Sequence, residues 1–476
     1  MTRPPRDNDP ESKNTSPAAD AADLSGATRR DFLKLAGLTA AGAILAGTGV
    51  AEAAPTATMG AITGKSSPKA LKGATIKPVV PLAKGRVLGA NDRINIAHIG
   101  TGGQGGSHIY LLGERHKEHN TQSIGVSDLW EKRRNGAKDG VTRFDPEAKV
   151  QVEEDYRRLI ENKDVDAVVI GTPEHWHAQI AVDALSAGKH VYCEKPMTRY
   201  LDEAFAIEAA VKSSGKAFQV GSQGCSEARW QVAGKAVQEG KIGQVVSCQG
   251  SYARNSKEGE WNYGIDEGAN PSNLNWKMWL GTAPDRPWDD DARARFFRYR
   301  KYRDYSGGLI GDLLPHKLHP LMIVLFGDKP QFPVSVTSLG TRAISTDREV
   351  ADTIHVLTEF AGGETMYVYL STVNEQGVED VIRGHKATLR FGSSVRLSPE
   401  RPFSEEIDAE DLPVNDPGAH MVLHQKNWLD AIRGIGKLAC PIELALPVQT
   451  IVALAEMSEV QGKTMHFDPA KRQIVT

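Results

Sequence analysis

The chain has 476 residues, 40% hydrophobic and 25% charged, which excludes collagen-like, coiled-coil and wholly disordered chains. Its 57 Lys and Arg residues against 60 Asp and Glu residues give a formal charge of -3, which argues against nucleic acid as a partner and favours a small-molecule ligand. The length predicts two or three domains at about 100–200 residues each. The four cysteines are widely spaced, without a CxxC pair, so we expect free thiols and neither a disulfide scaffold nor a zinc site.

Residues 1–53 have the features of a bacterial export signal. The segment Thr28–Lys34 reads TRRDFLK, which matches the twin-arginine (Tat) consensus. The uncharged stretch 35–51 that follows is too short and too weakly apolar for a comfortable membrane span. Small residues at Ala51 and Ala53 suit a signal peptidase. We therefore expect the Tat machinery to export the folded protein to the periplasm with cleavage near Ala53. An uncleaved anchor is the alternative.

Residues 54–89 are rich in Gly, Pro, Ser and Lys and show no helical or strand period. This composition predicts an extended arm or linker. Either a disordered spacer or an arm that lies on a neighbouring subunit would fit. Export in the folded state also predicts that any cofactor is loaded beforehand and held tightly.

A β-branched segment, 94–99, leads directly into the sequence Gly100-Thr101-Gly102-Gly103-Gln104-Gly105 and then into a helical stretch. The pattern GxGxxG between a strand and a helix is typical of dinucleotide binding. In this motif Gly100 permits the tight turn, Gly102 lets the backbone approach a pyrophosphate, and Gly105 lets the helix pack closely on the strand. The free N–H groups of the helix start would bind the phosphates.

The next apolar segment, 123–127, ends at Asp128, 23 residues after Gly105. An acidic residue at this position binds the ribose 2′-OH and repels a 2′-phosphate, so we expect NAD, with NADP less favoured. The basic residues of 132–134 could accept a phosphate and leave NADP open. A helix N-cap is the alternative role for Asp128.

Strand and helix patterns continue to alternate through 165–170, 178–187 and 190–193, with the loop sequence TPEHWH at 172–177. Alternation of this kind predicts a doubly wound parallel sheet over 90–218, with ligands beyond the carboxyl ends of its strands. Glu194-Lys195-Pro196 stands at such an end. The proline restricts Lys195 to extended geometry, where its ammonium group could bind a substrate hydroxyl.

The glycine motif, TPEHWHA and CEKPMT, in this order, resemble the Gfo/Idh/MocA family of NAD(P)-dependent sugar oxidoreductases. The resemblance covers about residues 87–465 and implies a catalytic role for Lys195. It also implies an α/β chain whose N-terminal Rossmann domain is followed by a C-terminal α+β domain, 219–476, with an open and mostly antiparallel sheet. That second domain would bind substrate and form a homo-oligomer, a dimer or a tetramer.

The resemblance extends to the sequence SGGLIGDLLPH, in which Asp312 and His316 match an Asp and a His of the family. Their i, i+4 spacing puts both on one face of a helix. Many members carry an acidic residue where this chain has His319. Pro315 and Pro320 predict a helix that is kinked or starts late. A metal site at Asp312, His316 and His319 is possible by spacing, but without further ligands nearby we expect no metal.

Strand-like segments at 245–249, 334–338, 353–357 and 366–370 are separated by turns, and 443–462 reads as a helix that packs back on the chain. Between them, 252–305 is rich in aromatic residues and arginines, which suit a hydroxyl-rich ring but could equally pin a loop to the core. Four residues are weak candidates for substrate contact: Arg254, Tyr263, Tyr305 and His319.

The sequence therefore predicts an exported NAD(P)-dependent dehydrogenase that acts on a sugar, polyol or glycoside. His316 would take the hydroxyl proton, Lys195 would stabilise the oxyanion or share the proton, and Asp312 would orient the substrate. The residues expected at the cofactor are Gly100, Gly102, Gln104, Gly105, Asp128, Thr172, Pro173, His175, His177, Glu194 and Lys195. Two rival hypotheses are a redox-neutral, NAD-dependent glycosidase that works by transient oxidation at C3 and elimination, and a non-enzymatic cofactor-binding scaffold.

Overall fold

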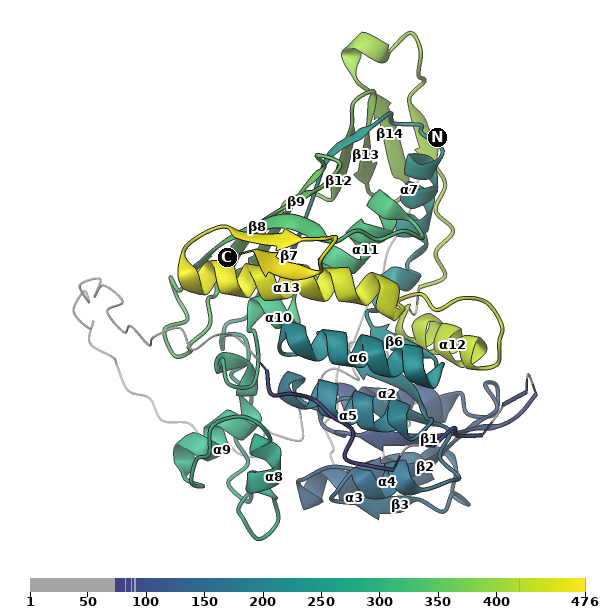
Figure 1. The fold of residues 1–476 in the computed structure, drawn as a ribbon, viewed down its shortest axis with the longest axis vertical. Helices are drawn as coiled ribbons and strands as arrows, with labels where there is room; N and C mark the ends of the chain where they lie inside the picture. Colours follow the sequence, from purple (N-terminus) through teal and green to yellow (C-terminus); the bar gives the residue numbers. More distant parts are fainter. Residues whose placement is uncertain (1–72, 82, 87, 90, 419, 476) are drawn as a thin grey trace, which may run out of the picture. The chain divides into compact units, whose positions relative to one another are not determined.

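The computed structural model describes residues 73–475 except 82, 87, 90 and 419 (Figure 1). The expected export signal and its cleavage position lie outside the described residues. The described part contains two sheets, one of six strands and one of eleven.

The first sheet is parallel throughout, with the strand order β3-β2-β1-β4-β5-β6. Its order reverses between β1 and β4, so the ends of these two strands flank the switch point at which such sheets bind ligands. All four residues of β4 are buried, as expected for a strand covered on both faces. The strands are β1 (Ile94–Ile99), β2 (Thr121–Ser127), β3 (Gln151–Glu153), β4 (Ala167–Ile170), β5 (His190–Glu194) and β6 (Phe218–Gly221).

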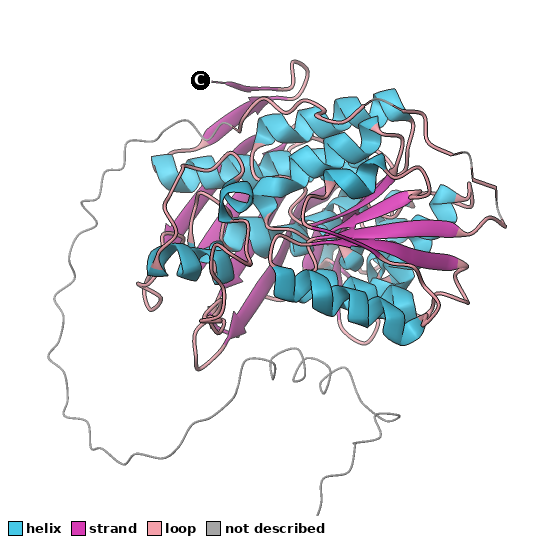
Figure 2. Cartoon of the chain, turned by 90° about the horizontal axis from the view of Figure 1, so that it is seen from below, coloured by secondary structure: helices cyan, strands magenta, loops and turns pink. Residues whose placement is uncertain are grey.

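Helices cover both faces of this sheet (Figure 2). They are α2 (Gly103–Glu114), α3 (Glu131–Phe144), α4 (Arg157–Glu161), α5 (Glu174–Ser186) and α6 (Leu201–Ser214). The doubly wound parallel fold expected for this part of the chain is thereby confirmed.

The second sheet is mostly antiparallel, and β7 and β10 form its one parallel pair among the described residues. Burial alternates along β9, which shows that one face packs on a core and the other faces water. The strands are β7 (Val245–Asn255), β8 (Pro333–Thr341), β9 (Thr353–Phe360), β10 (Thr365–Ser371), β11 (Val373–Asn374), β12 (Val381–Gly384), β13 (Ala387–Phe391), β14 (Val395–Pro399), β15 (Glu410–Leu412), β16 (Met465–Asp468) and β17 (Gln473–Val475).

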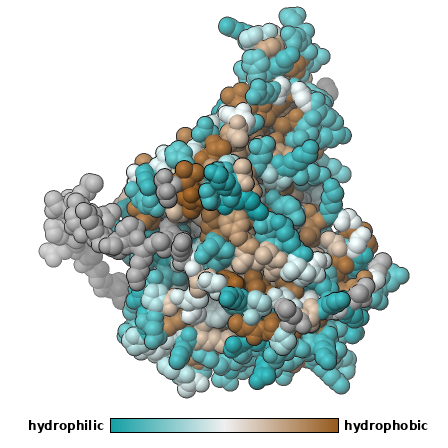
Figure 3. Space-filling model, in the orientation of Figure 1, coloured by the Kyte–Doolittle hydropathy of each residue, from teal (hydrophilic) through white to brown (hydrophobic). Residues whose placement is uncertain are grey.

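Two long helices, α11 (Leu314–Phe326) and α13 (Ile442–Gln461), pack against the buried face of this sheet (Figure 1). The segment Leu309–Phe326 is apolar enough to span a membrane, but 83% of it is buried inside the protein, as in a core helix. On the surface turned toward the viewer in Figure 3, apolar groups lie in several patches separated by hydrophilic ones. The remaining helices are α7 (Ala228–Gln238), α8 (Trp276–Leu280), α9 (Asp290–Phe297), α10 (Leu309–Asp312) and α12 (His420–Ile432).

The helix α12 lies on the first sheet, although it follows most of the second sheet in the chain. Trp428, Leu429 and Ile432 form one apolar cluster with Ile94 and Ile96 of β1. The first sheet therefore depends on residues far along the chain to cover one of its faces.

The described part of the expected arm, from Gly73 onward, runs along the helices of the first sheet in the same chain. The Val79 N–H donates to the Asp183 carboxylate at 2.7 Å, and Arg86 pairs with Asp166 at 2.7 Å. Val80 is buried. These contacts give the described part of the arm partners within its own subunit, unlike a free spacer.

Candidate active site

The glycine turn after β1 leaves no room for larger residues. Gly100 has φ +78°, and a Cβ there would lie 2.5 Å from the backbone nitrogen of Thr172. A Cβ at Gly105 would lie 1.9 Å from the carbonyl oxygen of Gly100. The helix α2 then starts with Gly102 at its N-cap and without a side-chain cap, so its first N–H groups stay available for an anion.

The surroundings of this turn fit a dinucleotide. The hydroxyl of Thr172, two residues after β4, is buried and has no hydrogen-bond partner among the described residues. Asp128 Oδ2 accepts from the Thr101 N–H at 2.9 Å, and its Oδ1 accepts from the Trp130 N–H at 3.0 Å. Asp128 therefore fastens the turn to the end of β2. It does not cap α3, whose N-cap is Trp130.

The Glu194 side chain at the end of β5 is buried within a polar network. It accepts from His108 at 2.7 Å and from Gln104 at 3.2 Å, and Gln425 of α12 donates to the other ring nitrogen of His108 at 2.7 Å. Burial alone would raise the pKa of Glu194, but the His108 hydrogen bond and the Lys195 charge hold it below its usual value. This network fixes the strand end that carries Lys195.

The histidines of the TPEHWH loop brace the backbone. His177 lies 2.8 Å from the Thr172 carbonyl and 2.7 Å from the Pro196 carbonyl, and it thereby joins the loop after β4 to the loop after β5. His175 lies 2.8 Å from the Trp279 carbonyl. Pro173 is the N-cap of α5. Both histidines are buried and contact backbone carbonyls. We expected them to contact a cofactor directly, whereas these contacts support the loops.

Lys195 and Asp312 form the centre of the site. The Lys195 ammonium lies 2.8 Å from Asp312 Oδ1 and 3.0 Å from the Asp312 carbonyl, and only 11% and 7% of these side chains are exposed. Burial would raise the pKa of Asp312, but the positive charges of Arg300, Lys195 and Arg254 hold it well below its usual value. The carboxylate therefore remains ionised in a nearly dry environment.

His316 stacks on Tyr252 of β7, with 5.1 Å between the ring centres. Burial and the neighbouring Lys195 lower the pKa of His316 to about 3. Its imidazole is therefore neutral at physiological pH and is a weaker proton acceptor than an ordinary histidine.

The i, i+4 spacing of Asp312 and His316 predicted that both lie on one face of a helix. In the structure they do not lie on one continuous helix. Asp312 ends α10, and α11 begins at Leu314. Pro315 has no N–H to donate to the preceding turn, which explains the interruption.

Two arginines complete the environment of Asp312. Arg300 Nε lies 3.1 Å from Asp312 Oδ1, and Arg254 Nη2 lies 3.6 Å from Oδ2. Arg254 also pairs with Glu260 at 2.9 Å. The sequence indicated Arg254 only weakly, and Arg300 was one of many arginines in its segment, because no local motif shows which of them turns toward Asp312.

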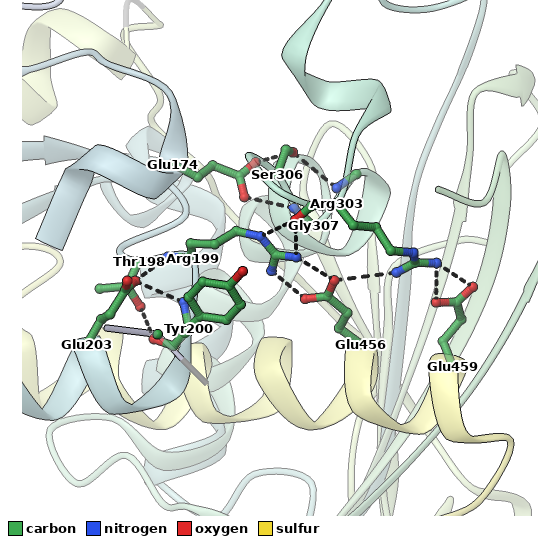
Figure 4. Close-up of polar contacts among 12 residues, drawn as sticks. Glu174, Thr198, Arg199, Tyr200, Glu203, Arg303, Ser306, Gly307, Glu456 and Glu459 are labelled. Atoms are coloured by element: carbon green, nitrogen blue, oxygen red, sulfur yellow. Dashed lines mark hydrogen bonds and ion pairs between the residues drawn. The ribbon is translucent and has the colours of Figure 1, made fainter. Parts of the chain in front are cut away.

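The loop that leads to Asp312 is held by residues of α5, of the loop after β5 and of α13 (Figure 4). Glu174 of α5 accepts from the Ser306 hydroxyl at 2.5 Å and from the Gly307 N–H at 2.9 Å. Arg199, four residues after Lys195, donates to the Arg303 carbonyl at 2.7 Å and forms a two-pronged ion pair with Glu456 of α13 at 2.5 and 2.8 Å. These contacts tie the Lys195 loop to the Asp312 loop.

The other three residues expected to contact the substrate, Tyr263, Tyr305 and His319, differ from Arg254 in that no contact with Asp312 is seen for them among the described residues. Tyr305 is fully buried and packs against Trp279, and His319 is buried with its Nδ1 donating to the Pro315 carbonyl at 2.9 Å. Tyr263 is half-exposed. In the described part of the chain no three His, Cys, Asp or Glu side chains lie close enough together to hold a metal ion. Burial of Tyr305 and His319 argues against direct contact with a substrate.

A parallel doubly wound sheet with a glycine turn at its switch point defines a dinucleotide-binding protein. Two family models match the chain, described as the oxidoreductase family with NAD-binding Rossmann fold over residues 94–222 and as its C-terminal alpha/beta domain over 257–476. The chain therefore belongs to the Gfo/Idh/MocA oxidoreductase family.

The individual proteins that resemble this chain do so at low sequence identity or over a small part of its length. A levoglucosan dehydrogenase of Pseudarthrobacter phenanthrenivorans is 39% identical over 21% of this chain and 25% of its own length. A glycosyl hydrolase family 109 protein of Shewanella sp. (strain ANA-3) is 25% identical over 75% of this chain and 69% of its own length. A solved levoglucosan dehydrogenase in complex with NADH and L-sorbose has a TM-score of 0.59 at 19% identity and covers 79% of this chain and 99% of that one. At this identity the structural likeness shows the fold alone.

Proposed function

We propose that the protein is an NAD-dependent dehydrogenase of a sugar or polyol. The observation that carries this proposal is the Lys195 ammonium held 2.8 Å from an ionised Asp312, with neutral His316 nearby, at the carboxyl edge of the dinucleotide-binding sheet. Bound NAD supplies a hydride acceptor. In the overall reaction a C–H hydride and the O–H proton leave the alcohol, and a carbonyl group, NADH and a proton result.

The side chains suit three distinct tasks in this reaction. Neutral His316 accepts the hydroxyl proton, and Lys195 stabilises the negative charge that develops on the oxygen. Asp312 holds the Lys195 ammonium group in place. Because Lys195 can also share the proton, the division of work between it and His316 is part of the proposal.

The cofactor is proposed to be NAD, because Asp128 stands at the end of β2, where a 2′-phosphate would meet its carboxylate. Arg133 is the feature that favours NADP, since its guanidinium lies about 3.1 Å from the position of a Cβ on Gly102. Comparing the dissociation constants of NAD and NADP for the purified protein decides between them. Retention of the nucleotide through gel filtration tests whether it is tightly bound.

The test of the function is to record absorbance at 340 nm while free sugars and aryl glycosides are added to the protein with NAD. A sustained rise with a free sugar is the expected result. The second candidate is the redox-neutral glycosidase, which is favoured by the similarity to a glycosyl hydrolase family 109 protein over three quarters of the chain. Release of the aglycone without lasting NADH would establish it in place of the dehydrogenase.

Export through the Tat pathway, with cleavage near Ala53, is a proposal that rests on the TRRDFLK segment. Replacing Arg29 and Arg30 by lysine should leave the protein in the cytoplasm of the producing cell. N-terminal sequencing of periplasmic protein should begin at Ala54.

A homo-oligomer is proposed from the outer face of the second sheet. Leu339 is 65% exposed and Leu357 is 51% exposed, and the pairing of the strands places His355, Tyr367 and Tyr369 beside them. A contiguous apolar group of this kind marks an association surface. Sedimentation velocity should show a dimer or tetramer that Leu357→Asp dissociates.

A further inference from the structure

His316 lacks the hydrogen-bond partner that usually fixes the ring of a histidine base. Such a ring is commonly oriented by a carboxylate or a carbonyl group that contacts one of its two nitrogens. In the part of the chain that the structure describes, neither ring nitrogen of His316 has a hydrogen-bond partner, and the residue is partly exposed. Both nitrogens are therefore available to a ligand, but no hydrogen bond sets the plane of the ring.

The polar groups near His316 are engaged with other residues. Asp312 Oδ1 lies 2.8 Å from the Lys195 ammonium and 3.1 Å from Arg300 Nε. Glu194 accepts from His108 at 2.7 Å. His319, on the same helix as His316, shows the usual arrangement, because its Nδ1 donates to the Pro315 carbonyl at 2.9 Å. His316 must be oriented by some other contact.

That contact is the ring of Tyr252. The two ring centres are 5.1 Å apart and the ring planes are inclined by 29°, which is a stacked arrangement. Tyr252 lies opposite Leu370 in the pairing of β7 with β10, and its ring packs against the main apolar core. The tyrosine ring is thereby fixed by the sheet and offers a flat, rigid surface to the imidazole.

The same strand also reaches the Lys195–Asp312 pair. Arg254 follows Tyr252 by two residues, so both side chains leave β7 on the same face. Arg254 Nη2 lies 3.6 Å from Asp312 Oδ2. One strand therefore directs Tyr252 to the base and Arg254 to the carboxylate that holds Lys195.

We propose that Tyr252 is a positioning residue whose ring holds the His316 imidazole in the orientation in which a free ring nitrogen meets the substrate hydroxyl. This inference rests on the proposed dehydrogenase function, in which His316 accepts the hydroxyl proton. Proton transfer needs the two heavy atoms about 2.6–3.2 Å apart, so a rotation of the ring would take the accepting nitrogen out of reach. The aromatic ring of Tyr252 carries this role, and its hydroxyl does not.

Two substitutions separate the ring from the hydroxyl. Tyr252→Phe keeps the stacked ring, and kcat should stay within about threefold of that of the unchanged protein. Tyr252→Leu removes the ring, and kcat and kcat/KM should both fall at least about tenfold, because a contact used only in the transition state is lost. The dissociation constant of NAD should not change in either variant, since the glycine turn that binds it lies on the first sheet.

The matched control is Phe403→Leu, which removes an aromatic contact with a histidine outside the site. The ring centres of Phe403 and His385 are 5.0 Å apart. This control should keep kcat unchanged. If Tyr252→Leu fails to fold, as judged by thermal unfolding and NAD binding, Tyr252→Ile replaces it, because a β-branched side chain suits a strand.

Crystal structures of the NADH-loaded variants test the inference without turnover. The His316 ring should keep its orientation in Tyr252→Phe and should rotate or take several orientations in Tyr252→Leu. An unchanged ring in Tyr252→Leu would overturn the inference.

The kinetic results can overturn it as well. Full kcat in Tyr252→Leu, an effect confined to KM, or an equal loss in Tyr252→Phe would each do so, the last because the hydroxyl would then carry the effect. If no sugar reduces NAD, the proposed dehydrogenase function fails, and the crystal structures alone decide whether Tyr252 orients His316.

Discussion

The ammonium group of Lys195 is the most directly testable group of the site. Lys195→Met removes the charge and the hydrogen bond to Asp312 but keeps the length of the side chain. We expect turnover to fall at least about a hundredfold, the scale of a lost acid–base group, while NAD still binds. Steady-state rates and a cofactor titration measure both effects. The exposed Lys212→Met serves as control, and near-normal turnover in Lys195→Met would contradict the assignment.

The low pKa of His316 predicts how kcat/KM depends on pH. A histidine with the ordinary pKa near 6.5 becomes protonated as pH falls below that value. It can then no longer accept a proton, and the activity of the enzyme would fall. Because the pKa of His316 is about 3 and that of Asp312 is also depressed, both stay deprotonated down to about pH 5. We expect kcat/KM to show no decline from these groups between pH 7 and pH 5. A tenfold loss per pH unit below 6.5 would disagree with this environment.

The residues that sequence analysis found belong to short motifs. Gly100, Gly105, Lys195 and Asp312 each lie within a few residues of a pattern whose geometry is local. The pairing of Arg300 with Asp312 could not be predicted in the same way. The two residues come together only when the loop between them folds, and no local motif indicates this. The pKa of His316 likewise depends on burial and on Lys195, which is distant in the sequence.

At the scale of elements, the ion pair between Arg199 and Glu456 joins the loop after β5 to α13 (Figure 4). Arg199→Met would leave the buried carboxylate with Arg303 alone, at 3.4 Å. Removing one partner of a buried pair costs about 3–5 kcal/mol of unfolding free energy. The double variant with Glu456→Gln should lose less, because it removes the unpaired charge. Denaturant unfolding measures both, and a single-variant loss below about 1 kcal/mol would contradict the expectation.

Strand and helix patterns predicted the parallel sheet well, because its buried strands are continuous apolar runs. The break between α10 and α11 was foreseen only as a kink or a late start, since Pro315 indicates an interruption without giving its position. The packing of α12 on the first sheet left no trace in the local pattern, because an apolar helix face does not specify which sheet it covers.

Across the whole molecule, buried histidines set the response to acid. Six of them have a pKa of about 3 or 4 because burial disfavours the charged form: His98, His175, His190, His316, His319 and His424. The unfolded chain takes up protons near pH 6.5 and the folded protein does not. Unfolding free energy should therefore fall as pH drops from about 6.5 towards 4. Each such histidine lowers it by at most about 1.4 kcal/mol per pH unit.

Glu203 opposes this trend, since burial raises its pKa to about 7, and burial also raises the pKa of Glu174 and Asp183, but these three acids are fewer than the six histidines. Thermal unfolding between pH 7.5 and 4.5 measures the net effect, and a Tm that stays constant below pH 6.5 would contradict it. His98→Gln should flatten the dependence, whereas the exposed His466→Gln should leave it unchanged.

The position of α12 has a consequence for how the protein is made. The ribosome completes all six strands of the first sheet long before it reaches Trp428 and Leu429, so Ile94 and Ile96 lack their cover during most of translation. Throughout that time the nascent chain shows an apolar face on which chaperones could act. A chain shortened before α12 would keep that face exposed permanently and lose Gln425 from beside His108.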